Sequence, residues 1–284
     1  MSRNSKRTNA GLEPTRPDVA DPAIQNVSHN LNFSAPTEHV DLPSRGRYYS
    51  EGHPLHNKDT IEIKYMTAKE EDILTSRNLL KKGLAIERLL SSIIIDKTID
   101  PGSLLIGDRN ALIVAARITG FGEEYETKVQ CPACAANVDH TFDLTNVSVN
   151  YAEEVPEEVQ ATDGNTFIVS LPIMKIDIEL KLLEGHDERR IIQLQENKRK
   201  KKLPETPLTD QLSAIIQSVN GSGDRSSINS LVNMMPAKDT RYLRRLYDRV
   251  IPNVDMSHNF ECTECGYLTD LEVPFTTDFF WPKR

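Results

Sequence analysis

Cys131-Pro-Ala-Cys134 and Cys262-Thr-Glu-Cys265 are the stretches that decide the fold, and they hold all four cysteines of the chain. Two residues separate the cysteines of each pair, and this spacing lets a tight turn direct both sulfurs to one point. Two such turns that face each other supply the tetrahedral four-sulfur shell of a structural zinc ion, with Zn–S distances of about 2.3 Å. We therefore predict one Zn²⁺ ion bound by Cys131, Cys134, Cys262 and Cys265.

Apolar and polar residues alternate on both sides of the first cysteine pair, which is typical of half-buried strands. The second pair is flanked by a similar but less regular pattern. Each half therefore reads as strand, turn, strand, and together the two hairpins predict a zinc ribbon. The apolar-side positions are Tyr125, Thr127, Val129, Val138, His140, Phe142 and Leu144 in the first half, and Phe260, Leu271, Val273 and Phe275 in the second.

Disulfides and redox chemistry are the alternatives to zinc at these cysteines. Two disulfides would require an oxidising compartment, and the sequence shows no signal peptide that would take the chain there. A redox-active CxxC usually begins a helix of a βαβ unit, and neither pair is in that position. A closed shell of four sulfurs leaves no position for water, so we expect a structural metal and not a catalytic one.

The composition of the chain limits the classes of function. With 284 residues, 38% of them hydrophobic, the chain is long enough for one large domain or two modest ones. The formal net charge of −8 disfavours a nucleic-acid binder that relies on bulk electrostatics. No apolar run reaches the length that crosses a bilayer, so we expect no membrane insertion.

We expect an α+β fold in which the zinc-ribbon-like hairpins join a body of helices and antiparallel strands. The predicted parts are an extended N-terminal arm (1–40), a strand and helical region (41–120), the zinc-ribbon-like module (121–150 plus 255–278) and an inserted strand and helix region (151–254). The arm is polar, so we expect it to be disordered when alone. Alternatively it becomes ordered against a partner, with Ile24, Val27, Leu31 and Phe33 as anchors.

Secondary-structure signals in the strand and helical region are clear. Ile61, Ile63 and Tyr65 alternate with charged residues and predict a strand. Thr67-Ala-Lys-Glu70 is a capping box, which predicts a helix to Lys82 that ends at Gly83. An apolar stripe predicts a second helix over 86–94, and a third helix is expected to be capped by Asp108 and ended by Gly120.

The inserted region predicts strands followed by helices. The strands are expected over 167–171 and 174–182, and the first helix over 185–202. Thr209 is expected to cap the next helix, which Asn220-Gly221 closes. A short helix then ends at Met234-Met-Pro236, and a last helix follows Pro236.

Three surfaces have both an ordinary and a functional interpretation. The cations Lys198–Lys202 either stabilise a helix C-terminus or contact nucleic acid. The exposed arginines of the last helix are either solvated or bind an acidic partner, and Phe279-Phe-Trp281 either seals a core or anchors a partner. The helix arginines are Arg241, Arg244, Arg245 and Arg249.

No set of residues in the sequence predicts a reaction centre. The chain shows no nucleophile with an evident base, and its seven histidines lie in unlike contexts. His53 and His56 have a spacing that permits metal binding, although a solvated loop pair is the commoner outcome. We therefore expect neither an enzyme nor a small-molecule substrate.

Several motifs, taken in their order along the chain, resemble those of the baseplate (hub) protein family of contractile-tailed, T-even-type bacteriophages. The likeness covers roughly residues 40–275 and carries no catalytic residues. The motifs are Leu42-Pro-Ser-Arg-Gly-Arg-Tyr48, Lys69-Glu-Glu-Asp-Ile-Leu74, Leu80-Lys-Lys-Gly83, Gly107-Asp-Arg-Asn-Ala-Leu112, Glu124-Tyr-Glu-Thr-Lys-Val-Gln-Cys-Pro-Ala-Cys134 and Leu182-Leu-Glu-Gly-His-Asp-Glu188.

The resemblance implies a structural role in the virion tail, with assembly in the host bacterial cytoplasm. The implied partners are hub, wedge or central tail proteins. Two alternatives stay open. One is a baseplate assembly factor that is absent from the mature particle, and the other is a zinc-ribbon nucleic-acid-binding accessory protein.

Overall fold

An antiparallel strand pair begins the part of the chain that the computed structural model describes, residues 35–274 and 277–280. Strand β1 (Thr37–Asp41) pairs with β2 (Thr60–Lys64), and the register places Val40 opposite Ile61. Ile61 and Ile63 are buried on one face of β2, as the alternating sequence predicts. The predicted anchors of the N-terminal arm, Ile24, Val27, Leu31 and Phe33, lie outside the described residues.

Helices α1 (Ala68–Thr75) and α2 (Arg77–Lys81) replace the single helix predicted as far as Lys82. The capping box is confirmed, since the Thr67 N–H donates to the Glu70 carboxylate. The prediction of a continuous helix is wrong because the backbone of Ser76 is extended. Thr75 contributes to this break, because its hydroxyl hydrogen-bonds to carbonyls of the preceding turn. Helix α3 (Ala85–Ile93) follows with its apolar stripe buried.

Helix α4 (Ile106–Phe121) begins after the short 3-10 helix η1 (Pro101–Ser103). The prediction that Asp108 caps this helix is wrong, because Asp108 lies inside the first turn and is fully buried. Its carboxylate accepts hydrogen bonds from the N–H and hydroxyl of Ser44 and from the hydroxyl of Tyr49. Asp108 therefore fixes the loop after β1. The helix also passes the predicted stop at Gly120 and ends before Gly122, whose φ is 88°.

A short ladder joins the two ends of the inserted region. Strand β5 (Ser148–Asn150) pairs antiparallel with β10 (Asn253–Asp255), although about a hundred residues separate them in the sequence. Helix α4 packs against β10 at Gly107, where an added Cβ would lie 1.9 Å from the Pro252 carbonyl oxygen. Only glycine allows this approach. The inserted region is thus held where it leaves and re-enters the helical part.

The inserted region contains a four-stranded antiparallel sheet in the order β6-β7-β8-β9. The strand predicted from Met174 is shorter than expected, because the N–H groups of Ile173 and Met174 donate to the Asp239 carboxylate and not to a neighbouring strand. The sheet buries Phe167, Val169, Ile178 and Leu180. The strand bounds are β6 (Val159–Ala161), β7 (Thr166–Ser170), β8 (Asp177–Lys181) and β9 (Ile216–Val219).

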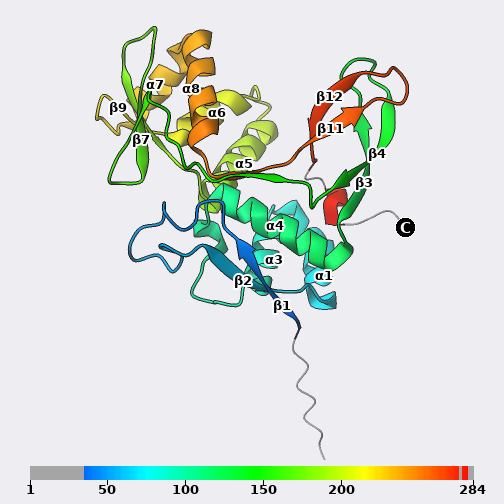
Figure 1. Cartoon of the computed structure of the whole chain (residues 1–284). Coiled ribbons are helices and arrows are strands. Elements are labelled where there is room, and N and C mark those ends of the chain that lie inside the picture. Colours follow the sequence, from blue (N-terminus) through cyan, green and yellow to red (C-terminus); the bar gives the residue numbers. More distant parts are fainter. Residues whose placement is uncertain (1–34, 275–276, 281–284) are drawn as a thin grey trace, which may run out of the picture. The chain divides into compact units, whose positions relative to one another are not determined.

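Four helices accompany this sheet, and α6, α7 and α8 lie beside it in Figure 1. The predicted cap at Thr209 is wrong, because α6 begins at Pro207 with Thr206 as its N-cap. The predicted continuation to Gly221 is also wrong, because 216–219 form strand β9 against β8. The β-branched Ile216 and Val219 suit that pairing better than a helix. The helix bounds are α5 (Gly185–Lys200), α6 (Pro207–Ile215), α7 (Arg225–Met234) and α8 (Ala237–Val250).

The described residues confirm the predicted α+β class, with helices and several small antiparallel sheets. The C-terminal 3-10 helix η2 (Thr277–Phe280) places Phe279 and Phe280 in the core, so this part of the aromatic cluster seals a core. Across the described part of the chain, no helix has both the length and the apolar character needed to cross a membrane.

Candidate metal centre

Two hairpins carry the four cysteines, as the sequence predicts. Strand β3 (Glu124–Gln130) pairs with β4 (Asn137–Asp143), and β11 (Ser257–Glu261) pairs with β12 (Leu268–Glu272). Figure 1 shows the two hairpins side by side, with the cysteine turns at their ends. The regular alternation of β3 and β4 buries Tyr125, Val129, Val138 and Phe142 on a single face.

The two cysteine turns have the same hydrogen-bond pattern. The Cys131 N–H donates to the Ala136 carbonyl, and the Ala135 N–H donates back to the Cys131 carbonyl. In the second turn the Cys262 N–H donates to the Tyr267 carbonyl, and the Gly266 N–H donates to the Cys262 carbonyl. The residue after each second cysteine has a positive φ, 59° at Ala135 and 68° at Gly266. This repeated local geometry directs both sulfurs of each pair the same way.

The four sulfurs converge. Cys131 Sγ lies 3.8 Å from Cys265 Sγ, and Cys134 Sγ lies 3.7 Å from Cys262 Sγ. All four sulfurs lie within 4.8 Å of one another, and no disulfide joins them. A tetrahedron with metal–sulfur distances of about 2.3 Å has edges of about 3.8 Å. The cross-hairpin separations therefore fit a tetrahedral four-thiolate shell.

The backbone around the sulfurs favours thiolates unequally. The N–H of Cys134 donates to the Cys131 sulfur and lowers the pKa of the Cys131 thiol to about 7, against the effect of burial. The N–H of Tyr267 lowers the pKa of Cys265, but burial and the three other sulfurs together raise it to about 12. Four thiolates this close repel one another, so all four ionise together only beside a cation. The chemistry of this donor set therefore fits a bound metal.

An aromatic layer lies between the hairpins behind the sulfurs. The ring of His140 on β4 stands edge-on to Phe260 on β11, with 5.3 Å between ring centroids. Phe142 contacts His258 in the same way at 5.5 Å. Burial lowers the pKa of His140, and the neighbouring His258 adds to this effect. Each hairpin therefore covers the inner face of the other.

Arg117 joins this module to the helical part, and the sequence did not single it out. The arginine lies on α4, is fully buried and donates to the backbone carbonyls of Phe279, Gly122 and Glu124 at 2.6 to 2.9 Å. Burial lowers the pKa of its guanidinium, while Tyr125 opposes this effect. An arginine in the middle of an apolar helix was the only signal in the sequence.

The other residues considered for a site have structural roles. His53 hydrogen-bonds to Ser103 and stacks on Tyr49, and His56 hydrogen-bonds to the Tyr49 carbonyl. Within the described residues, the four cysteines are the only group of three or more His, Cys, Asp or Glu side chains placed to hold a metal. The histidine pair is therefore part of the loop that covers η1.

The basic run Lys198–Lys202 is partly neutralised by neighbouring acids. Lys198 forms an ion pair with Asp210 at 2.5 Å, and Arg199 forms one with Glu205 at 3.3 Å. Lys200 lies 3.8 Å from Glu196. These contacts favour the interpretation of this run as the C-terminal end of a helix.

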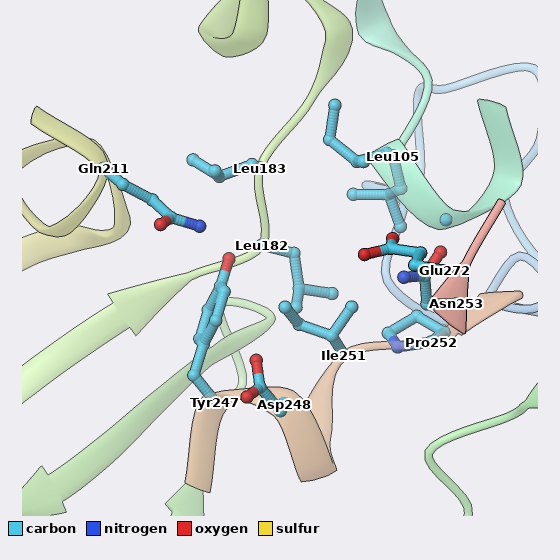
Figure 2. A pocket seen from close by; sticks show the side chains of 12 residues that line it. Leu105, Leu182, Leu183, Gln211, Tyr247, Asp248, Ile251, Pro252, Asn253 and Glu272 are labelled. Carbon is cyan, nitrogen blue, oxygen red and sulfur yellow. The ribbon is translucent and has the colours of Figure 1, made fainter. Parts of the chain in front are cut away.

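A cavity of about 400 Å³ lies between α4, α6, α8 and the segment that follows β8 (Figure 2). Its walls include Leu105, Leu182 and Leu183, and Figure 2 shows the side chains of Gln211 and Asp248 at its edge. Burial raises the pKa of Asp248, and Arg244 opposes this effect. The lining residues include no serine, threonine, cysteine or histidine.

Comparison with known proteins identifies the family. The family model described as "T4 bacteriophage base plate protein" matches residues 36–281. No curated protein and no solved structure matches the chain. The family match spans both hairpins, the helical part and the inserted region, and so covers most of the 284 residues. The chain therefore belongs to the T4 bacteriophage base plate protein family.

Proposed function

We propose that this chain is a structural subunit of a contractile phage tail baseplate, in which one Zn²⁺ ion fastens the two hairpins together. Membership of the base plate family supports a structural role, association with other baseplate proteins and a place in the virion tail. The metal-ion part of the proposal depends on one observation, the convergence of the four sulfurs at separations of 3.7 and 3.8 Å across the hairpins.

Cys131, Cys134, Cys262 and Cys265 would hold the ion and leave no coordination position for a substrate or water. Binding of such an ion adds directly to the free energy of folding, because the unfolded chain lacks the preformed shell. The ion would close the long segment between the two cysteine pairs and act as a fixed cross-link. We accordingly expect no catalytic turnover.

We further propose that hub or wedge proteins are the direct partners, and that assembly takes place in the host cytoplasm. The division into an arm (1–40), a strand and helical region (41–120), the module of 121–150 plus 255–278 and an inserted region (151–254) also remains a proposal. The ladder between β5 and β10 supports the boundary of the inserted region.

Metal analysis of the full-length chain tests the first part. Protein purified without added zinc or chelator is expected to contain one zinc per chain by elemental analysis. The double variant Cys131→Ser/Cys262→Ser, which changes the two buried sulfurs, is expected to contain none. Protein lacking metal, or a variant that retains it, would refute the zinc site.

Mass spectrometry of purified phage tests the role in the particle. We expect peptides of this chain in constant proportion to other baseplate proteins after several rounds of purification. Detection in infected cells but absence from particles would favour the assembly factor. A nucleic-acid accessory role has less support, since the net charge is −8 and the cations at 198–200 already contact acids.

A further inference from the structure

The outward face of α8 is a row of cations. Lys238, Arg241, Arg245 and Arg249 are all exposed and follow one another at intervals of three and four residues. At 3.6 residues per turn this spacing places them on one side of the helix, over a length of about 16 Å. The opposite side is buried through Leu243, Leu246, Tyr247 and Val250. We call these four cations the α8 basic stripe.

The stripe has no acidic partners in the described part of the chain. None of its four side chains forms an ion pair or a hydrogen bond with the residues that the structure describes. Arg245 contacts only a neighbouring ring, with its guanidinium carbon 5.7 Å from the Tyr242 centroid. The exposed acid of α8 nearest to the stripe is Asp248, which Arg244 influences. The stripe is therefore a local region of positive electrostatic potential.

Several cations of helix α5 are arranged differently. On α5, Arg189 forms an ion pair with Glu87, Lys198 with Asp210, and Lys200 lies near Glu196. A helix face that only needs to be solvated usually mixes the two signs of charge in this way.

Two features of the stripe are unfavourable for its own helix, although Arg249 lies in the last turn, where the helix dipole favours a cation. Arg241 and Arg245, and Arg245 and Arg249, are like charges four residues apart, a spacing that destabilises a helix. Lys238 adds a positive charge in the first turn, where the helix dipole disfavours cations. A helix face that carried both acidic and basic side chains would avoid these costs. The stripe therefore indicates a function that requires positive charges without acidic partners.

We propose that the α8 basic stripe is a docking surface for an acidic segment of another baseplate protein. The identity of that partner as a baseplate protein rests on the function proposed above. The stripe would recognise the partner by complementary charge. The rest of the chain sharpens this selection, because a chain of net charge −8 repels an acidic protein except at such a stripe. Nucleic acid is a poorer match, since the net charge repels a polyanion at long range.

Fluorescence anisotropy on the purified full-length chain tests this proposal. The probe is a labelled 20-residue helical peptide of Glu, Ala and Leu with Glu on one face, and a labelled thymidine 20-mer serves as the nucleic-acid probe. The test variant is Arg241→Gln/Arg245→Gln/Arg249→Gln. The control is Lys69→Gln/Lys128→Gln/Lys201→Gln, which changes the net charge equally at scattered exposed positions.

We expect the stripe variant to bind the acidic peptide on the order of tenfold more weakly than the wild type at low salt, with the control variant close to wild type. Thermal unfolding of the stripe variant should occur at the wild-type temperature or higher, because like-charge repulsion is relieved. Such an unfolding temperature would show that the stripe variant is folded and that its weaker peptide binding has another cause.

Three results would overturn the proposal. The first is equal weakening in both variants, which would be an effect of net charge alone. The second is tighter binding of the thymidine 20-mer than of the peptide at 0.15 M salt, a test condition close to physiological ionic strength. The third is no binding of the peptide by the wild type. Absence of the chain from phage particles would remove only the partner's identity and leave the binding result intact.

Discussion

The two ends of the paired hairpins are held together by different means. At the tip, the turns at 131–136 and 262–267 meet through four sulfurs, and Tyr267 and Leu268 beside them are 44% and 70% exposed. At the base, Tyr125 and Phe142 are fully buried, Phe279 is 1% exposed, and Arg117 donates to three backbone carbonyls. The tip lacks the buried area that stabilises the base.

This difference shows how a small strand pair is stabilised where no core is available. Two-stranded hairpins are marginal in water unless they pack on something else. At the base the α4 helix and η2 supply that packing, whereas at the tip each hairpin has only the other. The proposed metal ion would supply the missing free energy without further residues. Substitutions at the sulfur cluster and in the packed base should therefore have different effects.

The largest effect is expected from removal of the proposed metal site at the tip. In the Cys131→Ser/Cys262→Ser variant, hydrogen exchange should become fast around 128–138 and 259–269, while amides near Tyr125 and Phe142 stay protected. The reason is that the base keeps its own core when the thiolate shell is lost. Uniform loss of protection across the chain would show that the two ends are not independent.

The next largest effect is expected from Arg117→Met at the base. The substitution removes the donor to the buried Phe279 carbonyl and to the part-buried Gly122 and Glu124 carbonyls, and we expect a loss of about 3 kcal/mol in the free energy of unfolding. Denaturant unfolding measures the loss, and zinc content should remain at the wild-type value. Arg88→Met, an exposed arginine on α3, is the control and should change stability by less than about 0.5 kcal/mol.

The third largest effect is expected in the helical part, from protonation of the Glu70 carboxylate. Burial by itself raises the pKa of Glu70, but hydrogen bonds from Lys64, Ser92 and Thr67 outweigh it and hold the pKa at about 2. Because this folded-state pKa is below the ordinary value of 4.5, the stabilisation is present above pH 4.5 and is lost as the pH falls toward 2.

Chemical unfolding of the wild type and Glu70→Gln across this pH range measures the contribution. At pH 6 the variant should be less stable by about 2 kcal/mol, and the difference should shrink as the pH falls toward 2. A difference that does not change with pH would show that the carboxylate charge contributes nothing there.

The smallest effect is expected from the two turns of the tip. Ala135 and Gly266 occupy the same position with positive φ, where a side chain is strained. Ala135→Gly should raise stability by about 0.5 kcal/mol, and Gly266→Ala should lower it by about 1 kcal/mol. Thermal unfolding of the zinc-loaded chains measures both, and equal signs would contradict the equivalence of the two turns.

The sequence predicts the hairpins and the convergence of the sulfurs because both depend on local spacing. A CxxC turn and alternating strands are specified by neighbouring residues, and the four-sulfur shell then brings the distant halves together. The α8 helix is predicted for the same reason, since its buried positions recur at helical intervals.

The errors arise where distant residues decide local structure. Asp108 looks like a helix cap, yet Ser44 and Tyr49 draw it into the core. The 216–219 segment continues a helical pattern, yet the free edge of β8 pairs with it. Arg117 gives only the weak signal of a cation within an apolar helix, because its partners are backbone carbonyls that any sequence provides.

The sulfur cluster also affects the order of events during synthesis. Cys265 follows Cys131 by 134 positions, so a nascent chain exposes its first pair of thiols long before the second leaves the ribosome. At the usual elongation rates of about 5–20 residues per second, this interval lasts roughly 7 to 27 seconds. During it the first turn can offer an ion only two of its four ligands. The four-sulfur shell can therefore be completed only after the whole region between the two cysteine pairs has been synthesised and has folded so that the second pair meets the first.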